Sequence, residues 1–293
     1  MTSTLLHEPR LGHVQCLGAR GLHRMAYREW GDPANDRVLV CVHGLARQGR
    51  DFDTLAMAMR DHYRVVCPDV VGRGESDHLA DSGGYQVPAY VADMVTLLAR
   101  LDAGVLHWLG TSMGGLIGMG LAALPSSPIR RLVLNDIGPT VDADGVARIA
   151  DYLGRPLSWP SEDAAADYLL SISKGFGAHS RDEWLALTRP MLRRRGDAFV
   201  LHYDPAIATA LRAITPAAAT AGQAALWAAY DAIRCPTLIL RGAQSDVLSR
   251  DTALAMTARG PKARLHEFAE VGHAPTLVRA DQVAVVREFL LAA

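Results

Sequence analysis

Residues 105–124 read VLHWLGTSMGGLIGMGLAAL, and this stretch decides the fold. Its first five residues form an apolar run that predicts a buried strand, and a helical pattern begins near Met113. Between the two lies Gly110-Thr111-Ser112-Met113-Gly114, which has a glycine two residues to each side of the serine. In so sharp a turn from strand to helix, only glycines allow the required close approach of the backbone. The pattern therefore predicts that the Ser112 hydroxyl is held out from the bend.

The rest of the chain alternates short apolar runs with helical patterns, which is typical of a parallel sheet with helices on both faces. Strands are predicted at 38–42, 64–67, 105–109, 131–134, 237–240 and 264–268, and helices at 52–60, 87–101, 113–124 and 282–291. From residue 139 to about residue 230 only helical stretches are found, of which 164–171 and 217–230 are the clearest. We therefore expect a core of residues 1–138 and 231–293, with residues 139–230 inserted as a helical cap over the edge of the sheet.

With these elements the chain resembles the α/β-hydrolase superfamily, in particular its capped, esterase-like members with a Ser-Met-Gly-Gly turn. The resemblance covers nearly the whole chain and is weakest in the first 20 residues and in the cap. It implies an α/β fold with a mostly parallel sheet of the eight-stranded type, flanked by helices. It also implies that Ser112 is a nucleophile, which needs a neighbouring base and an acid that orients the base.

The order of these residues in the family is nucleophile, acid, histidine, and this order selects His273 as the base. His273 lies late in the chain, in a loop after a predicted strand, whereas His266 lies inside that strand. Two residues are candidates for the acid. We take Asp246 as the acid, because it follows the strand 237–240 by a short loop, where the family usually carries it. Asp136 ends the preceding strand, where some relatives carry the acid, and is otherwise interpreted as capping a turn at the entrance of the cap.

Attack on an acyl carbon creates an oxyanion that must be met by fixed hydrogen-bond donors. The resemblance implies two backbone N–H donors, one from Met113 directly after the nucleophile and one from Leu45 in Val42-His43-Gly44-Leu45. In the family this His-Gly pair shapes the loop. His43 is therefore interpreted as a structural residue and not as a second base.

Two residues are candidates for substrate binding. Arg47, with Arg50 close behind it, follows the oxyanion loop and is placed to meet an anionic part of a substrate. The alternative is that both arginines are solvated residues at the start of a helix. Trp227 lies in the Ala-rich stretch 217–230 of the cap, which is expected to select the acyl or alcohol part of the substrate.

The composition argues against several other classes of protein. Thirty Lys plus Arg against thirty-one Asp plus Glu leave a formal charge of −1, so neither nucleic acid nor an anionic membrane surface is expected as a partner. The four cysteines lack CxxC spacing, and the sequence has no HExxH motif or phosphate loop, so we expect reduced thiols, no metal and no cofactor. No apolar stretch is long enough for a signal peptide or a membrane span, which makes the cytoplasm the expected location. The oligomeric state is left open.

The expected reaction is hydrolysis of a carboxylic ester of a small or medium acyl substrate through an acyl-enzyme. The same three residues would also serve to cleave a lactone, a thioester or the carbon–carbon bond of a ring-fission product, or to transfer the acyl group to another acceptor. Ala274 stands where ring-fission hydrolases usually have an aromatic residue, which disfavours that alternative. A ligand-binding member without activity is disfavoured because all three triad residues are present.

Overall fold

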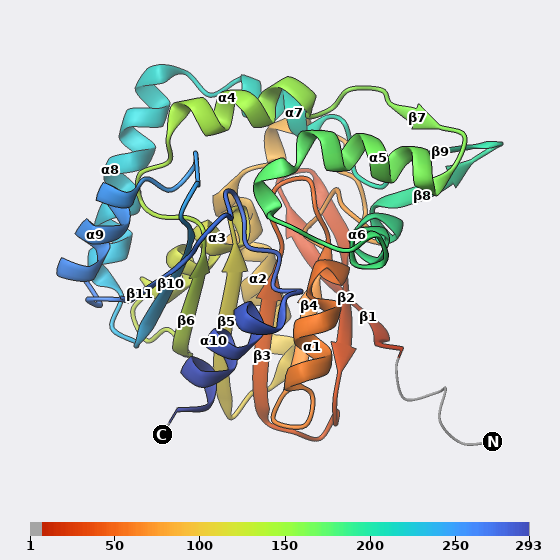
Figure 1. Cartoon of the computed structure of the whole chain (residues 1–293). Coiled ribbons are helices and arrows are strands. Elements are labelled where there is room, and N and C mark those ends of the chain that lie inside the picture. Colours follow the sequence, from red (N-terminus) through yellow and green to blue (C-terminus); the bar gives the residue numbers. More distant parts are fainter. Residues whose placement is uncertain (1–7, 293) are drawn as a thin grey trace.

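The computed structural model describes residues 8–292, and its centre is an eight-stranded sheet (Figure 1). The strands lie in the order β1-β2-β4-β3-β5-β6-β10-β11. β2 pairs antiparallel with β1 and β4, and the remaining neighbours pair in parallel. The mostly parallel sheet expected from the sequence is present, with all six predicted strands. The bounds are β1 (Arg10–Gly18), β2 (Gly21–Trp30), β3 (Arg37–Val42), β4 (Arg64–Pro68), β5 (Val105–Thr111), β6 (Ile129–Asn135), β10 (Thr237–Gly242) and β11 (Arg264–Phe268).

Both faces of this sheet are buried beneath helices. Along β3, Val38 and Val40 pack into one core cluster, and the alternate residues Leu39 and Cys41 pack into the other. The first cluster includes residues of α2 (Val87–Leu101), α3 (Met113–Ala122) and α9 (Arg250–Ala258), and the second includes residues of α1 (Asp53–Met59) and α10 (Ala280–Leu291). Burial on both faces explains why the central strands are continuous apolar runs in the sequence.

The segment 139–230, called the insertion from here on, separates β6 from β10 and lies across the carboxyl ends of the central strands (Figure 1). The expectation of a purely helical segment is wrong, because three short strands form a second sheet of order β7-β9-β8. These strands are two to four residues long, and Trp159 is their one buried residue, so none of them forms the buried apolar run of a core strand. The elements are α4 (Ala143–Tyr152), β7 (Ser158–Trp159), α5 (Glu162–Ile172), α6 (Arg181–Thr188), β8 (Leu192–Arg195), β9 (Ala198–Leu201), α7 (Ile207–Arg212) and α8 (Pro216–Ala232), the last of which extends two residues into the predicted core.

The parallel pairing fixes where functional residues can meet. β5, β6, β10 and β11 are consecutive neighbours in the sheet and run in the same direction. The loops that follow them therefore converge at one edge, which is where open α/β sheets place their sites. These loops carry Ser112, Asp136, Asp246 and His273.

Two further features bear on the classes of protein considered above. No helix in the part of the chain that the structure describes has the length and hydropathy needed to cross a bilayer. The four cysteine thiols are unpaired, and Cys16, Cys41 and Cys67 are buried, where a thiol packs as a small apolar group.

Candidate active site

The turn that carries Ser112 depends on glycines that let three backbone segments touch. Ser112 has φ 53° and ψ −117°, in the left-handed range of φ, between the end of β5 and the start of α3. A Cβ on Gly110 would lie 2.1 Å from the carbonyl oxygen of Gly114, and a Cβ on Gly114 would lie 2.0 Å from that of Val42. Any larger residue at either position would push the strand and the helix apart. The strained turn predicted from the sequence is therefore present.

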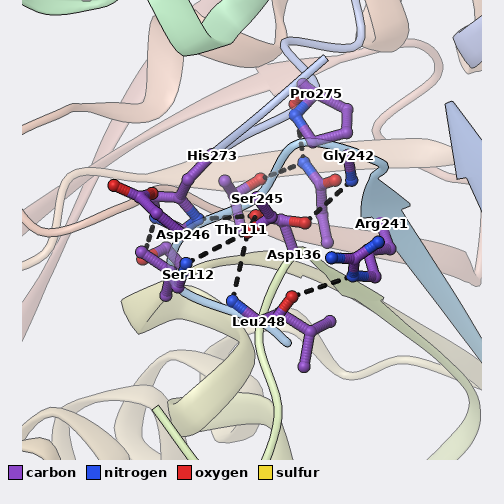
Figure 2. A network of polar contacts seen from close by, with 12 residues as sticks. Thr111, Ser112, Asp136, Arg241, Gly242, Ser245, Asp246, Leu248, His273 and Pro275 are labelled. Carbon is purple, nitrogen blue, oxygen red and sulfur yellow. Dashed lines mark hydrogen bonds and ion pairs between the residues drawn. The ribbon is translucent and has the colours of Figure 1, made fainter. Parts of the chain in front are cut away.

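His273 connects Ser112 to a buried carboxylate (Figure 2). Its Nε2 lies 3.0 Å from Ser112 Oγ, and its Nδ1 lies 2.8 Å from Asp136 Oδ2. The side chains of His273 and Asp136 are 8% and 0% exposed. This is the arrangement in which a histidine can take the serine proton while a carboxylate fixes its tautomer.

Asp136 is held by donors from the neighbouring strand's end. The Gly242 N–H donates to Oδ1 at 2.9 Å, and the Ser245 hydroxyl donates to Oδ2 at 2.6 Å. With His273 Nδ1, the buried carboxylate has three hydrogen-bond partners, which offset the cost of removing its charge from water. The carboxylate is therefore fixed in the orientation that His273 requires.

The prediction that Asp246 orients His273 is wrong, and the alternative residue, Asp136, holds that place. Asp246 instead accepts two hydrogen bonds from Arg148 of α4, from Nε at 2.5 Å and from Nη2 at 2.8 Å. These bonds lower the pKa of Asp246, and both side chains are 40% exposed. Sequence order could not separate the two acids, because β6 and β10 are parallel neighbours whose ends adjoin.

The two predicted oxyanion donors are next to the nucleophile. Gly44 brings its loop against the turn, since a Cβ there would contact Ser112 Cβ at 3.6 Å. Within residues 8–292, no hydrogen bond from the backbone N–H of Leu45 or of Met113 is found, so both donors are free to meet an oxyanion.

His43 shapes the oxyanion loop, in agreement with its structural interpretation. Its Nε2 accepts the Val70 N–H at 2.9 Å, so the proton is on Nδ1, which donates to the Gly44 carbonyl at 2.7 Å. Burial lowers the pKa of His43 to about 3, which keeps the ring neutral. A neutral ring with both nitrogens engaged cannot act as a second base.

Arg73 also supports this loop, and the sequence analysis missed it. Its side chain is fully buried, and Nε donates to the Leu45 carbonyl at 2.9 Å. Nη1 donates to the Val71 carbonyl and to the Tyr90 hydroxyl. In the sequence Arg73 stands between two glycines, Gly72 and Gly74, which indicates a tight loop, and nothing local indicates that its guanidinium reaches back to Leu45.

Two cavities open beside Ser112. The smaller one, of about 100 Å³, is lined by His273, Arg47 and Arg148 among others. The larger one, of about 530 Å³, is lined by apolar residues that include Met113 and Ile137. Ser112 lines both cavities.

The two predicted substrate-binding residues differ in their positions. Arg47 lines the smaller cavity, but its Nε and Nη2 each bond Asp51 at 2.6 Å, and Nη2 also donates to the Leu187 carbonyl. It therefore ties the core loop to the insertion and is not a solvated residue. Trp227 lines neither cavity: its indole N–H donates to Thr140 and Arg259 stacks on its ring, so the prediction that it binds substrate is not supported.

One group of buried side chains within residues 8–292 is spaced closely enough to share a metal ion: Cys16, His23 and Asp93. They belong to β1, β2 and α2, and none of them lines either cavity. His23 Nε2 lies 3.0 Å from Asp93 Oδ2, so the pair already satisfies the buried carboxylate. We interpret the group as a structural contact between the sheet edge and α2.

With this geometry in place, comparison with known proteins gives the class. A family model described as the α/β-hydrolase fold matches residues 37–280, and the chain belongs to that family. A solved α/β hydrolase from Novosphingobium aromaticivorans has 32% identity and a TM-score of 0.85, over 97% of this chain and 98% of that one. A solved putative hydrolase from Rickettsia typhi has 28% identity and a TM-score of 0.86, over 96% and 98%.

A more similar relative narrows the class. A 3-hydroxybutyrate-oligomer hydrolase from Cupriavidus necator is 54% identical, over 97% of this chain and 99% of that protein. The cleavage of an oligomer of a hydroxy acid is ester hydrolysis. The family, the relative and the serine turn together identify the chain as a serine ester hydrolase.

Proposed function

We propose that Ser112, His273 and Asp136 are the catalytic triad with which this hydrolase cleaves carboxylic esters. The observation that carries the proposal is the hydrogen-bonded series from Asp136 Oδ2 through the two ring nitrogens of His273 to Ser112 Oγ. Its spacing of 2.8 and 3.0 Å lies within the range that proton transfer to a base requires.

The geometry supports a two-step reaction. His273 Nε2 takes the hydroxyl proton as Ser112 Oγ attacks the acyl carbon, and Asp136 stabilises the resulting imidazolium. The oxyanion accepts hydrogen bonds from the backbone N–H groups of Leu45 and Met113. The intermediate collapses, and His273 gives its proton to the departing alcohol oxygen, which leaves an acyl-enzyme. Water, activated by the same ring, then attacks the acyl carbon and restores Ser112.

We propose an oligomer of 3-hydroxybutyrate as the substrate. The relative that is 54% identical over nearly the whole chain is named for this substrate. The larger cavity, of about 530 Å³, has no acidic, basic or histidine side chain among the described residues that line it. Such a lining suits a string of uncharged ester units.

The insertion is proposed to act as the cap of this site. The residues of α4, α5 and α7 line the two cavities from the side opposite the sheet, with Tyr152, Leu169 and Ile207 as examples. The cap would hold the substrate over Ser112 and limit the entry of water. The unpaired thiols suit a reducing compartment, and the cytoplasm remains the proposed location.

Labelling with a fluorophosphonate tests the nucleophile. We expect the reagent to attach to Ser112, and Ser112→Ala to lose both the label and at least about 10³-fold of the turnover of 3-hydroxybutyrate dimer and trimer. Ser173→Ala is a matched control, because Ser173 lines the same smaller cavity but lies outside the hydrogen-bonded series. A label that persists in Ser112→Ala and is lost in Ser173→Ala would overturn the assignment.

A further inference from the structure

The two cavities beside Ser112 differ in the charged residues that line them. The position of His273 shows which cavity would take the alcohol part of an ester and which the acyl part. His273 must hand a proton to the alcohol oxygen as the ester breaks. His273 lines the smaller cavity and not the larger one. The alcohol part of the ester therefore belongs in the smaller cavity, and the acyl part in the larger one.

The charge of the smaller cavity favours an anionic alcohol part. Arg47 and Arg148 line it, and no carboxylate in the described part of the chain does. The larger cavity has an uncharged lining, so a carboxylate on the acyl part would lose its water without gaining a partner. An ester with a negative charge on the alcohol side alone matches both cavities.

Of the two arginines, Arg148 is the one that a substrate can reach. Nε and Nη2 of Arg47 bond Asp51, and Nη1 contacts the Met191 sulfur. The Arg47 and Asp51 side chains are only 15% and 17% exposed. Arg148 is paired with Asp246 in a setting where both side chains are 40% exposed. Because this pair faces solvent, a substrate carboxylate can reach the guanidinium and join or replace Asp246.

The surroundings of Arg148 preserve its charge. The hydrogen bond and charge of Asp246 raise the pKa of the Arg148 guanidinium, and Tyr152, one turn further along α4, raises it further. Asp246 holds the guanidinium at the edge of the smaller cavity, which His273 also lines. The ion pair thus keeps a charged guanidinium beside the place where the alcohol part leaves, and a substrate carboxylate would share it with Asp246 or displace that side chain.

We propose that Arg148 binds a carboxylate on the alcohol part of the ester, so that the enzyme prefers esters in which a hydroxy acid with a free acid group is the leaving alcohol. This inference rests on the proposed function and adds to it the end of the oligomer at which cleavage starts. In an oligomer of a hydroxy acid, the piece released as the alcohol ends in the free carboxylate. Cleavage would therefore start at the carboxyl end of the chain, with a short piece in the smaller cavity of about 100 Å³.

Three esters of similar size test the direction. The first is 3-butanoyloxybutanoate, with a carboxylate on the alcohol side; the second is its methyl ester; the third is the monoethyl ester of glutaric acid, with a carboxylate on the acyl side. For the wild-type enzyme we expect kcat/KM for cleavage of the butanoyl bond to be about ten- to a hundredfold higher for the first than for the second, as for one charge-assisted contact. The third is expected to be the poorest substrate.

Arg148→Gln should reduce the preference of the first ester over the second to less than about threefold, mainly through KM. Arg189→Gln, which removes an exposed arginine of the insertion paired with Glu162, should keep the wild-type preference. The rate of fluorophosphonate labelling of Ser112 shows whether each variant retains the folded site.

The outcomes separate the two proposals. Equal turnover of the first two esters by the wild type, or a preference that survives in Arg148→Gln, would overturn the carboxylate site and leave the proposed function standing. Absence of turnover of all three esters by labelled, folded enzyme would overturn the proposed function itself.

Discussion

The site lies between the loops that follow the strands of the sheet, called the floor, and the insertion, called the roof. Residues of the floor alone hold Asp136, whereas a residue of the roof holds Asp246. Asp136 on the floor is fully buried and fixed by Gly242, Ser245 and His273. Asp246, which follows the adjoining strand, is 40% exposed and bonds Arg148 of the roof. Burial with several partners fixes a group for catalysis, whereas an exposed pair can exchange partners with a ligand.

The largest difference is expected between a histidine of the floor and one of the roof. His273→Ala removes the base and should lower kcat on p-nitrophenyl butanoate by about 10⁴- to 10⁶-fold. His179 of the roof hydrogen-bonds the Gly177 carbonyl and the Thr276 hydroxyl and does not contact Ser112, and His179→Ala should lower kcat by less than about tenfold. Comparable losses of kcat in the two variants would contradict the claim that the catalytic base lies in the floor and not in the roof.

The second prediction concerns the acid sensitivity of two buried histidines, His43 in the floor and His107 in strand β5. The pKa of His43 is lowered to about 3 and that of His107 to about 4, mainly by burial, so below about pH 6 the unfolded chain binds protons that the folded chain does not. Stability therefore falls as the pH falls towards these values, by up to about 1.4 kcal/mol per pH unit for each histidine. Burial raises the pKa of Asp69 to about 6, so below that pH the folded chain binds a proton there and the slope of about one histidine is offset. Urea unfolding at pH 7, 6 and 5 measures the slope. An unchanged free energy of unfolding across this range would contradict it.

A smaller effect is expected from the second partner of Asp136. Ser245→Ala removes the hydroxyl that donates to Asp136 Oδ2 and accepts the Val247 and Leu248 N–H groups. We expect kcat to fall by about tenfold, as for one hydrogen bond to a charged group. Ser249→Ala is the matched control, because Ser249 caps α9 in the same loop without contacting Asp136. Equal losses of activity in the two variants would mean that Ser245 acts only on the loop.

The fold was predictable because its signals are local. Burial on both faces makes β3, β5, β6 and β10 continuous apolar runs, and the glycines around Ser112 mark a turn that few other residues allow. β7, β8 and β9 were missed because they are only two to four residues long and mostly unburied. Even the apolar run of β9, Ala198–Leu201, is too short to be told from part of a helix by its pattern. The local sequence pattern therefore predicts the strands of the main sheet better than it predicts those of the insertion.

The site was predictable only in part, because it depends on which strand ends adjoin. The glycines around it selected Ser112, and the order of residues along the chain selected His273; both take part in the hydrogen-bonded series. The choice between Asp136 and Asp246 needed the position of Arg148, 98 residues before Asp246 in the chain, which draws Asp246 towards the insertion. The role of Arg73 likewise depends on a contact with Leu45 across 28 residues.

The most direct measurement of the central claim is kcat on an uncharged ester for Asp136→Asn and Asp246→Asn, compared in one assay. Asparagine keeps the size of either side chain and removes its charge. We expect Asp136→Asn to lower kcat by about 10⁴-fold, because His273 loses the carboxylate that fixes its tautomer. We expect Asp246→Asn to lower it by less than about threefold. A loss of 10³-fold or more in Asp246→Asn, with near-normal turnover in Asp136→Asn, would contradict the account.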